Sequence, residues 1–124
     1  MLRLNINFNL DITEEDIDDI MSTALEGGIN YWCNEARAKG KLLGEYISEQ
    51  ISRGGTLLLR ETEENKVHEL TCEKLLKGIE QAIEEDYYTQ YEWWNCNGLD
   101  TGSIDAAVAD IIIQLALFGT EVYG

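Results

Sequence analysis

Apolar and polar residues alternate along the first ten positions of the chain. Every second residue is apolar, and arginine or asparagine stands between them: Leu2, Leu4, Ile6, Phe8 and Leu10 against Arg3, Asn5, Asn7 and Asn9. Successive side chains of a strand point to opposite faces, so this alternation is typical of a strand with one buried face. We therefore expect a half-buried β-strand over residues 2–10. The alternation also differs from the continuous apolar block of a signal peptide.

The next segment has the period of a helix. Its apolar residues recur at intervals of three and four, which places them on one face: Ile17, Ile20, Met21, Ala24 and Leu25. Thr13 stands at the position of an N-cap, and Asp16 three residues later is placed to complete a capping box. Gly27 and Gly28 end the period. The pattern predicts an amphipathic helix between Thr13 and Gly28.

The middle of the chain predicts a second helix and then a hairpin. Residues 29–52 have a helical spacing of apolar side chains, with Gly40 and Gly44 as weak points, and the run Arg-Gly-Gly at 53–55 ends it. The buried side would hold Trp32, Ala36, Leu43, Ile47 and Ile51. Two short β-like runs then flank the polar turn Glu-Thr-Glu-Glu-Asn at 61–65. This second pattern predicts a β-hairpin.

Two further helices complete the predicted fold. Residues 71–86 are amphipathic, whereas residues 104–118 are apolar on nearly every side and are followed by Gly119. A helix that is apolar all round belongs in the middle of a core. The chain of 124 residues is long enough for a core that needs neither metal nor disulfide. We expect one α+β domain over residues 1–124, with about four helices packed on a small three-stranded antiparallel sheet.

The segment after Asp86 combines aromatic and acidic residues, and two interpretations remain open. The apolar stripe of the third helix begins with Leu76, Ile79 and Ile83. If the helix continues, the stripe also takes up Tyr87, Gln90, Tyr91 and Trp94. Glu85 and Glu92 then lie opposite the stripe, with Tyr88 beside them and Trp93 off the stripe. Exposed aromatics among charges are typical anchors of binding surfaces. Alternatively, the helix ends near Asp86 and a loop covers the core with both tryptophans. The run Asn-Cys-Asn-Gly at 95–98 ends the segment in either case.

The net charge of −15 is unevenly distributed. Residues 1–34 hold seven acids and one base, residues 35–77 hold eight of each, and residues 78–124 hold nine acids and no base. The two flanks therefore carry all of the net charge. This composition disfavours direct binding of DNA or RNA, since affinity for nucleic acid rests on lysine and arginine. A negative surface is suited to a basic partner surface, although acidity also serves solubility.

The residues with catalytic or metal-binding chemistry are few and scattered. The single histidine, His68, has no nucleophile motif near it, and Cys33, Cys72 and Cys96 lack the close pairs of a zinc site. Three widely spaced cysteines favour free thiols in a reducing cytoplasm. The acidic run at 14–19 lacks the loop pattern of a calcium site. We expect no catalytic residues, no metal, no cofactor and no membrane span. The longest apolar run, Ile111 to Phe118, is much shorter than the roughly 20 residues that a span requires.

The candidate partner-binding residues come from both acidic flanks. They are the exposed face of the first helix and the acidic aromatic segment: Glu15, Asp19, Glu26, Glu85, Tyr88, Glu92 and Trp93. Carboxylates four residues apart on a helix are about 6 Å apart along its axis. Each strand of duplex DNA carries a charge about every 3.4 Å. One helix is therefore too sparse to imitate a phosphate strand, whereas two acidic elements side by side would come closer.

Three stretches resemble small acidic phage and prophage proteins of Firmicutes: "DIMSTALEGGINYWC", "SEQISRGGTLLL" and "IDAAVADIIIQLALFG". The resemblance implies a phage accessory protein, and small acidic phage proteins include anti-CRISPR and other anti-defence inhibitors. We therefore expect a protein-binding inhibitor in the cytoplasm of a bacterial host, which covers a basic, nucleic-acid-binding surface of a host or defence protein. The alternative is a structural or regulatory phage protein that acts as a homo-oligomer.

Overall fold

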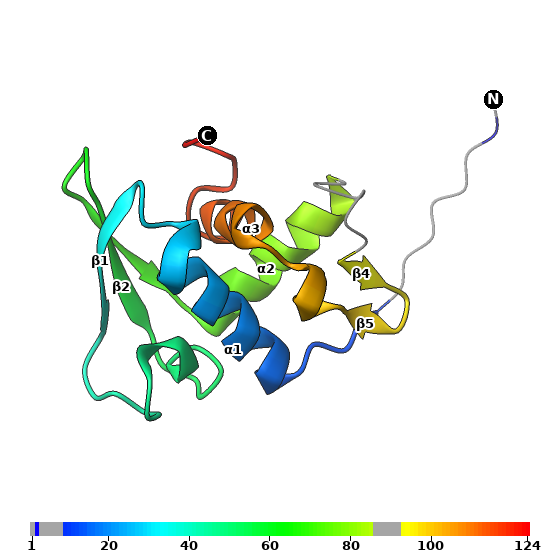
Figure 1. Cartoon of the computed structure of the whole chain (residues 1–124), viewed down its shortest axis with the longest axis horizontal. Helices are drawn as coiled ribbons and strands as arrows, with labels where there is room; N and C mark the ends of the chain where they lie inside the picture. The colour runs from blue at the N-terminus through cyan, green and yellow to red at the C-terminus, as the bar shows by residue number, and fades with distance from the viewer. Residues whose placement is uncertain (1, 3–8, 86–92) are drawn as a thin grey trace.

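The computed structural model of the chain describes residue 2, residues 9–85 and residues 93–124. Within these residues, three α-helices, a three-stranded antiparallel sheet and a short two-stranded hairpin form an α+β fold. The sheet lies at one end of the molecule, the helices pack beside it, and the hairpin lies at the other end (Figure 1). The expected fold class is confirmed, with three helices in place of about four. Apart from its ends, the strand expected over residues 2–10 lies outside the described residues.

Helix α1 (Glu14–Thr23) forms as its sequence predicts. The backbone nitrogen of Thr13 donates to Asp16 Oδ2, and the backbone nitrogen of Asp16 donates to Thr13 Oγ1, both at 3.0 Å. These two bonds are the expected capping box. Ile17, Ile20 and Met21 are buried. The helix then widens into the π-helical turn η1 (Ala24–Gly28), which ends at the two glycines.

Helix α3 (Ala106–Phe118) occupies the middle of the core, as its apolar sequence predicts. Every residue from Val108 to Leu115 is buried. Helix α2 (Cys72–Glu84) packs along it and buries Leu75, Gly78, Ile79 and Ala82. Side chains of Asp105 and Thr71 cap the two helices, and Gly119 ends α3 in the left-handed conformation with φ 73°. The expected stripe of α2 is corrected at one position, because Leu76 is 40% exposed.

The helix expected over residues 29–52 is wrong. This segment forms strand β1 (Cys33–Ala38), a loop and a single 3-10 turn, η2 (Ile47–Glu49). Ala36, which helical spacing placed on a buried helix face, pairs instead with Leu59 of the neighbouring strand. Gly40 has φ +77°, which lies outside the helical region. Pairing between distant strands therefore overrides a local helical pattern that two glycines already weaken.

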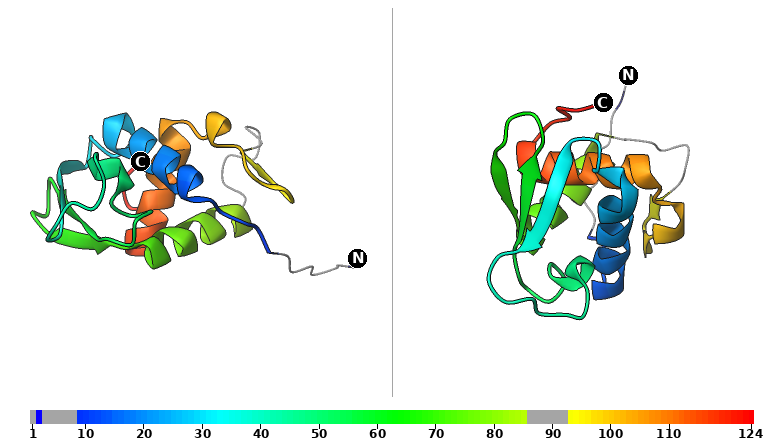
Figure 2. Two further views of the ribbon diagram at one scale, coloured as in Figure 1. Left: turned by 90° about the horizontal axis from the view of Figure 1, so that it is seen from below. Right: turned by 60° about the vertical axis from the view of Figure 1, so that its left-hand side comes forward.

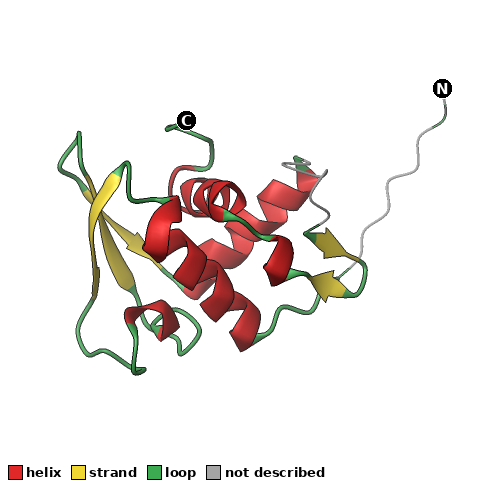
Figure 3. Cartoon of the chain, in the orientation of Figure 1, coloured by secondary structure: helices red, strands yellow, loops and turns green. Residues whose placement is uncertain are grey.

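The expected hairpin is confirmed by strands β2 (Leu57–Glu61) and β3 (Val67–Leu70), which pair antiparallel. The sheet order is β1-β2-β3, so β2 is central. Leu57 and Leu59 alternate with half-buried neighbours and join the core with α3. Figure 2 shows the sheet from two further sides, and Figure 3 shows the helices grouped beside it.

Replacing Gly78 with alanine is expected to destabilise the protein. A Cβ atom at residue 78 would lie 2.5 Å from the carbonyl oxygen of Ile112 and 2.9 Å from Ala116 Cβ, so α2 and α3 would have to separate. Alanine favours a helix over glycine by about 1 kcal/mol, but we expect the clash to outweigh this and leave a net loss of about 1–2 kcal/mol. Urea unfolding measures the change. Glu80→Ala, on the exposed side of α2, is the control and should change stability by less than about 0.5 kcal/mol. Equal stability of Gly78→Ala and the wild type would contradict the close packing.

Candidate functional site

The two acidic flanks lie side by side in the folded chain. The hydroxyl of Thr101, in the 3-10 turn η4 (Thr101–Ser103), donates to Asp19 Oδ2 at 2.7 Å. A Cβ atom at Gly98 would lie 3.5 Å from the carbonyl oxygen of Asp11, and one at Gly28 would lie 3.0 Å from that of Ala106. Residues 98–106 therefore follow α1 and η1 from beginning to end. Strands β4 (Trp94–Asn95) and β5 (Gly98–Leu99) form the hairpin at the start of this path (Figure 1).

Exposed carboxylates line both sides of this contact, and we call them the acidic seam: Asp11, Glu14, Glu15, Asp19, Glu26, Asp100 and Asp105. The sequence has no lysine or arginine in residues 9–34 or 93–124. Across the described residues, the ion pairs all join side chains between Glu35 and Lys77. Among the described residues, the charges of the seam are therefore neither neutralised by paired cations nor buried. They produce a negative electrostatic potential in the solvent around this surface.

Of the expected partner-binding residues, the structure brings three together. Glu15, Asp19 and Glu26 are exposed on α1 and η1 and belong to the acidic seam. Glu85 follows the end of α2, where its Oε1 accepts a hydrogen bond from Gln81 Nε2 at 3.1 Å. Tyr88 and Glu92 lie outside the described residues. Sequence reasoning missed Asp100 and Asp105, whose place beside α1 depends on long-range contacts.

The expectation that Trp93 is an exposed anchor is wrong. Its side chain is 0% exposed and belongs to the core, and Trp94 packs against that core half-buried. Helix α2 ends at Glu84 instead of continuing, and Trp94 pairs with Leu99 in the β4–β5 hairpin. The backbone nitrogen of Asp100 also donates to the carbonyl oxygen of Trp93 at 2.8 Å. The alternative is therefore confirmed in its placement of both tryptophans against the core. The expected stripe positions Tyr87, Gln90 and Tyr91 lie outside the described residues.

A second group of polar side chains surrounds the buried carboxylate of Asp110 on α3. Trp32 Nε1 donates to Asp110 Oδ1 at 2.7 Å, and the Tyr31 hydroxyl donates to Oδ2 at 2.5 Å. Gln114 Nε2 adds a bond to Oδ1 at 2.9 Å. Burial, together with the hydrogen bond to Asp110, raises the pKa of Tyr31 well above its ordinary value. The Tyr31 hydroxyl therefore stays protonated and continues to donate.

Gln114 also fixes the segment after α3. Its Oε1 accepts from the backbone nitrogens of Val122 and Tyr123, each at 2.8 Å, and its Nε2 donates to the carbonyl oxygen of Tyr123 at 3.0 Å. The ring of Tyr123 then stacks on Trp32, with centroids 5.4 Å apart and an interplanar angle of 4°. The Gln114 side chain thus joins α3 to the segment at 122–123. Through the stacked ring of Tyr123 it is also linked to Trp32, the residue before β1.

The Tyr123 hydroxyl donates to one oxygen of Glu61, and the other oxygen contacts His68 Nε2. Burial opposes ionisation of Glu61, but the bonds from Tyr123 and His68 outweigh it and hold the pKa of Glu61 below its ordinary value. The hydrogen bond to Glu61 is the main cause that raises the pKa of Tyr123 to about 12. Glutamate, histidine and tyrosine meet here as they do in some catalytic sites.

These polar groups link separate elements of the fold through hydrogen bonds. Among the described residues, every buried side-chain nitrogen or oxygen has a hydrogen-bond partner. Likewise, no group of three or more His, Cys, Asp or Glu side chains in that part of the chain is placed to hold a metal ion. The arrangement therefore fixes the strands and the segment at 122–123 to α3. A sequence signal existed, since Asp110 and Gln114 are a polar pair four residues apart on an otherwise apolar helix.

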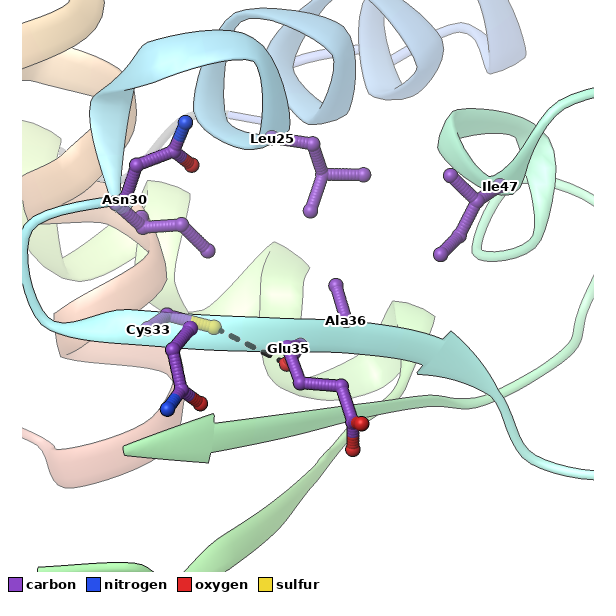
Figure 4. A pocket seen from close by; sticks show the side chains of 8 residues that line it. Leu25, Asn30, Cys33, Glu35, Ala36 and Ile47 are labelled. Carbon is purple, nitrogen blue, oxygen red and sulfur yellow. Dashed lines mark hydrogen bonds between the residues drawn. The ribbon is translucent and has the colours of Figure 1, made fainter. Parts of the chain in front are cut away.

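A hollow of about 450 Å³ lies between η1, β1 and η2. Leu25, Ile47 and Ala36 point into it (Figure 4). The polar residues Asn30, Asn34 and Glu35 also border it. Cys33 also borders it, and its Sγ donates to the carbonyl oxygen of Glu35 at 3.4 Å. Burial raises the pKa of the Cys33 thiol, which makes it a poor nucleophile at neutral pH.

No family model matches the sequence, and neither a curated protein nor a solved structure matches it. In the part of the chain that the structure describes, no helix has both the length and the apolar character needed to cross a membrane.

Tyr123 is expected to make the protein sensitive to alkali. Its pKa is about 12 in the folded protein and about 10 in an unfolded chain. A raised folded pKa gives stability that is complete below the unfolded value and is lost as the pH rises towards the folded value. The free energy of unfolding should therefore fall between about pH 10 and pH 12, and it should fall less steeply in Tyr123→Phe. Urea unfolding across this range measures both slopes. Tyr46→Phe, at an exposed tyrosine, is the control, and equal slopes for Tyr123→Phe and the wild type would contradict the Glu61 contact.

Proposed function

We propose that this protein is a binding inhibitor whose acidic seam covers a basic, nucleic-acid-binding surface of a host or defence protein, such as a CRISPR nuclease. The observation that supports this proposal is the meeting of the two acidic flanks along α1, linked by Thr101 and Asp19. In this proposal the protein acts by binding and not by catalysis, in the cytoplasm of a bacterial host. The resemblance to small acidic phage proteins agrees with it.

The arrangement of the seam suits a surface that normally holds phosphates. Glu15, Asp19 and Glu26 follow α1 and η1, and Asp100 and Asp105 run beside them on the neighbouring segment. Two rows of carboxylates give a denser line of charge than one helix provides alone. A nucleic-acid-binding surface carries lysines and arginines that contact phosphates. A protein that presents carboxylates to these side chains occupies the surface and excludes the nucleic acid.

The burial of Trp93 changes the expected character of the binding. With this tryptophan in the core, the seam contributes charge in place of an aromatic anchor. Exposed charges act mainly on the rate of association, and salt screens them. We therefore expect capture of the partner to be fast at low salt and to weaken as the salt concentration rises.

Reversal of two seam charges is expected to slow capture of the partner. In Glu15→Lys/Glu26→Lys, two exposed carboxylates become cations, and the association rate should fall by about tenfold with a flatter dependence on salt. The control is Glu63→Lys/Glu64→Lys, which makes the same change in net charge in the exposed turn between β2 and β3. Circular dichroism first establishes that both variants fold.

The partner is obtained by affinity capture from a Firmicutes host lysate at low and at physiological salt, with the wild type and both variants as baits. The proposal requires captured nucleic-acid-binding proteins that the seam variant loses and the control retains. It also requires the wild type to block binding of DNA or RNA by the purified captured protein in a mobility-shift assay. Equal capture by both variants, or a captured protein that still binds nucleic acid, would overturn the proposal.

A further inference from the structure

The outer edge of β1 is a second surface with a defined chemistry. Strand β1 lies at the end of the sheet order, and within the described residues it pairs with β2 alone. Figure 2 shows β1 standing at the margin of the sheet with β2 next to it. The backbone nitrogen of Lys39 donates to the carbonyl oxygen of Thr56 at 2.9 Å, so Lys39 faces β2. Since backbone groups alternate in direction along a strand, Ala38 and Ala36 direct their N–H and C=O groups to the open side.

Charges of opposite sign stand on either side of Ala36. Glu35 and Arg37 are adjacent along one face of β1, with side chains that are 48% and 55% exposed. An antiparallel pair related by a two-fold axis at Ala36 would place Glu35 of each copy opposite Arg37 of the other. The sequence of this edge is therefore complementary to itself in one register and in one orientation.

We propose that β1 of one copy pairs with β1 of a second copy about this axis, which joins the two sheets through their edges. The hydrogen-bonding direction suits this register. Ala36 would face Ala36 of the second copy as a hydrogen-bonded pair, in which each residue donates its N–H and accepts through its C=O. Glu35 and Arg37 would then form the non-hydrogen-bonded pairs, where Cα atoms are only about 4.5 Å apart and side chains are closest. Backbone and charge thus select the same arrangement.

The overall charge of the chain does not prevent this contact. Residues 35–77 balance eight acids with eight bases, and the ion pairs of β1 join Glu35 to Arg37 and to Arg60. The β4–β5 end of the acidic seam lies at the opposite end of the molecule from β1 (Figure 1). Repulsion between distant exposed charges is largely screened beyond about 8 Å at physiological salt. A second copy can therefore approach the end of the molecule that holds the sheet. We call it the neutral end, because residues 35–77 carry no net charge.

The shape of the outer edge of β1 also favours the addition of a strand from a second copy. The edge residues Ala36 and Ala38 are small, and Ala36 points into the hollow between η1, β1 and η2 (Figure 4). A β-bulge separates Cys33 from Glu35, so the regular part of the strand begins at Glu35. Bulges and charges commonly protect edge strands from unspecific pairing. On β1 the same charges permit one partner, a second copy in the register described.

Charge exchange between positions 35 and 37 tests the pairing. Each of Glu35→Arg and Arg37→Glu replaces two attractive cross-strand pairs by two repulsive ones and should raise the dimer dissociation constant about tenfold or more. The double variant Glu35→Arg/Arg37→Glu restores opposite charges across the axis and should return the constant to within about threefold of the wild type. Sedimentation equilibrium over a wide concentration range measures the constants. Circular dichroism verifies each fold.

The single variants also separate this contact from an effect of bulk charge. Glu35→Arg makes the chain less negative, so it would strengthen association if net repulsion decided the outcome, whereas cross-strand pairing requires it to weaken association. A wild type that stays monomeric at the highest soluble concentration overturns the proposal. Single variants that dimerise like the wild type, or a double variant that does not recover, overturn it as well.

Amide hydrogen exchange gives a second readout that needs no substitution. The Ala36 and Ala38 amides face the open edge, so they should exchange more slowly as the protein concentration rises and the dimer forms. The Lys39 amide is bonded to Thr56 in a single copy, and its exchange should change much less. Exchange at Ala36 and Ala38 that is independent of concentration, in samples that are dimeric by sedimentation, would place the interface elsewhere and refute the proposal.

Discussion

The buried carboxylate of Asp110 is the constraint on which most of the structure depends. A charge inside a core is strongly unfavourable unless hydrogen bonds replace its lost water. Here Tyr31, Trp32 and Gln114 provide those bonds, so the chain just before β1 has to lie against α3. Gln114 in turn binds the backbone at 122–123. One helix therefore positions both the chain that leads into the first strand of the sheet and the segment at 122–123.

The acids divide into those with a structural role and those without one. Asp16 closes a capping box, Asp105 caps α3, and Glu61 and Asp110 are bonded in the interior. Glu14 and Glu15 lie in the first turn of α1, where the helix dipole favours a negative charge. Glu26 lies at the other end of the same helical segment, where the dipole disfavours one. The fold gives no reason for an acid at this position, whereas the proposed binding of a basic surface would give one.

The sequence correctly predicted the elements that nearby residues determine. The predictions failed where contacts between distant segments determine the secondary structure. Thr13 and Asp16 mark the start of α1 within four residues of sequence, and Gly119 ends α3 in the same local way. Residues 29–52 carry a helical pattern too, but β1 gains its stability from pairing with β2, which lies some twenty residues further along. Trp93 was misplaced for a related reason, because α2 ends at Glu84 and the β4–β5 hairpin turns the chain. The sequence predicted the acids of the seam on α1 and η1 but not their neighbours on residues 98–106. The contact between the two flanks depends on the tertiary structure.

The acidic seam and the edge of β1 divide the surface by charge, and this division limits how copies and partners can assemble. A like-charged copy is repelled from the seam, whereas a basic surface is attracted to it, so the seam is left open for a different protein. The neutral end carries the described lysines and arginines, between Arg37 and Lys77, and there a second copy meets both signs of charge. Pairing through β1 would therefore leave the β4–β5 end of each seam accessible, because that end lies at the opposite end of the molecule (Figure 1). Two seams on one particle gain avidity only if a partner offers two basic surfaces at a matching distance. A partner with a single basic surface would gain nothing from the pairing, so the proposed self-association and the proposed inhibition can be tested separately.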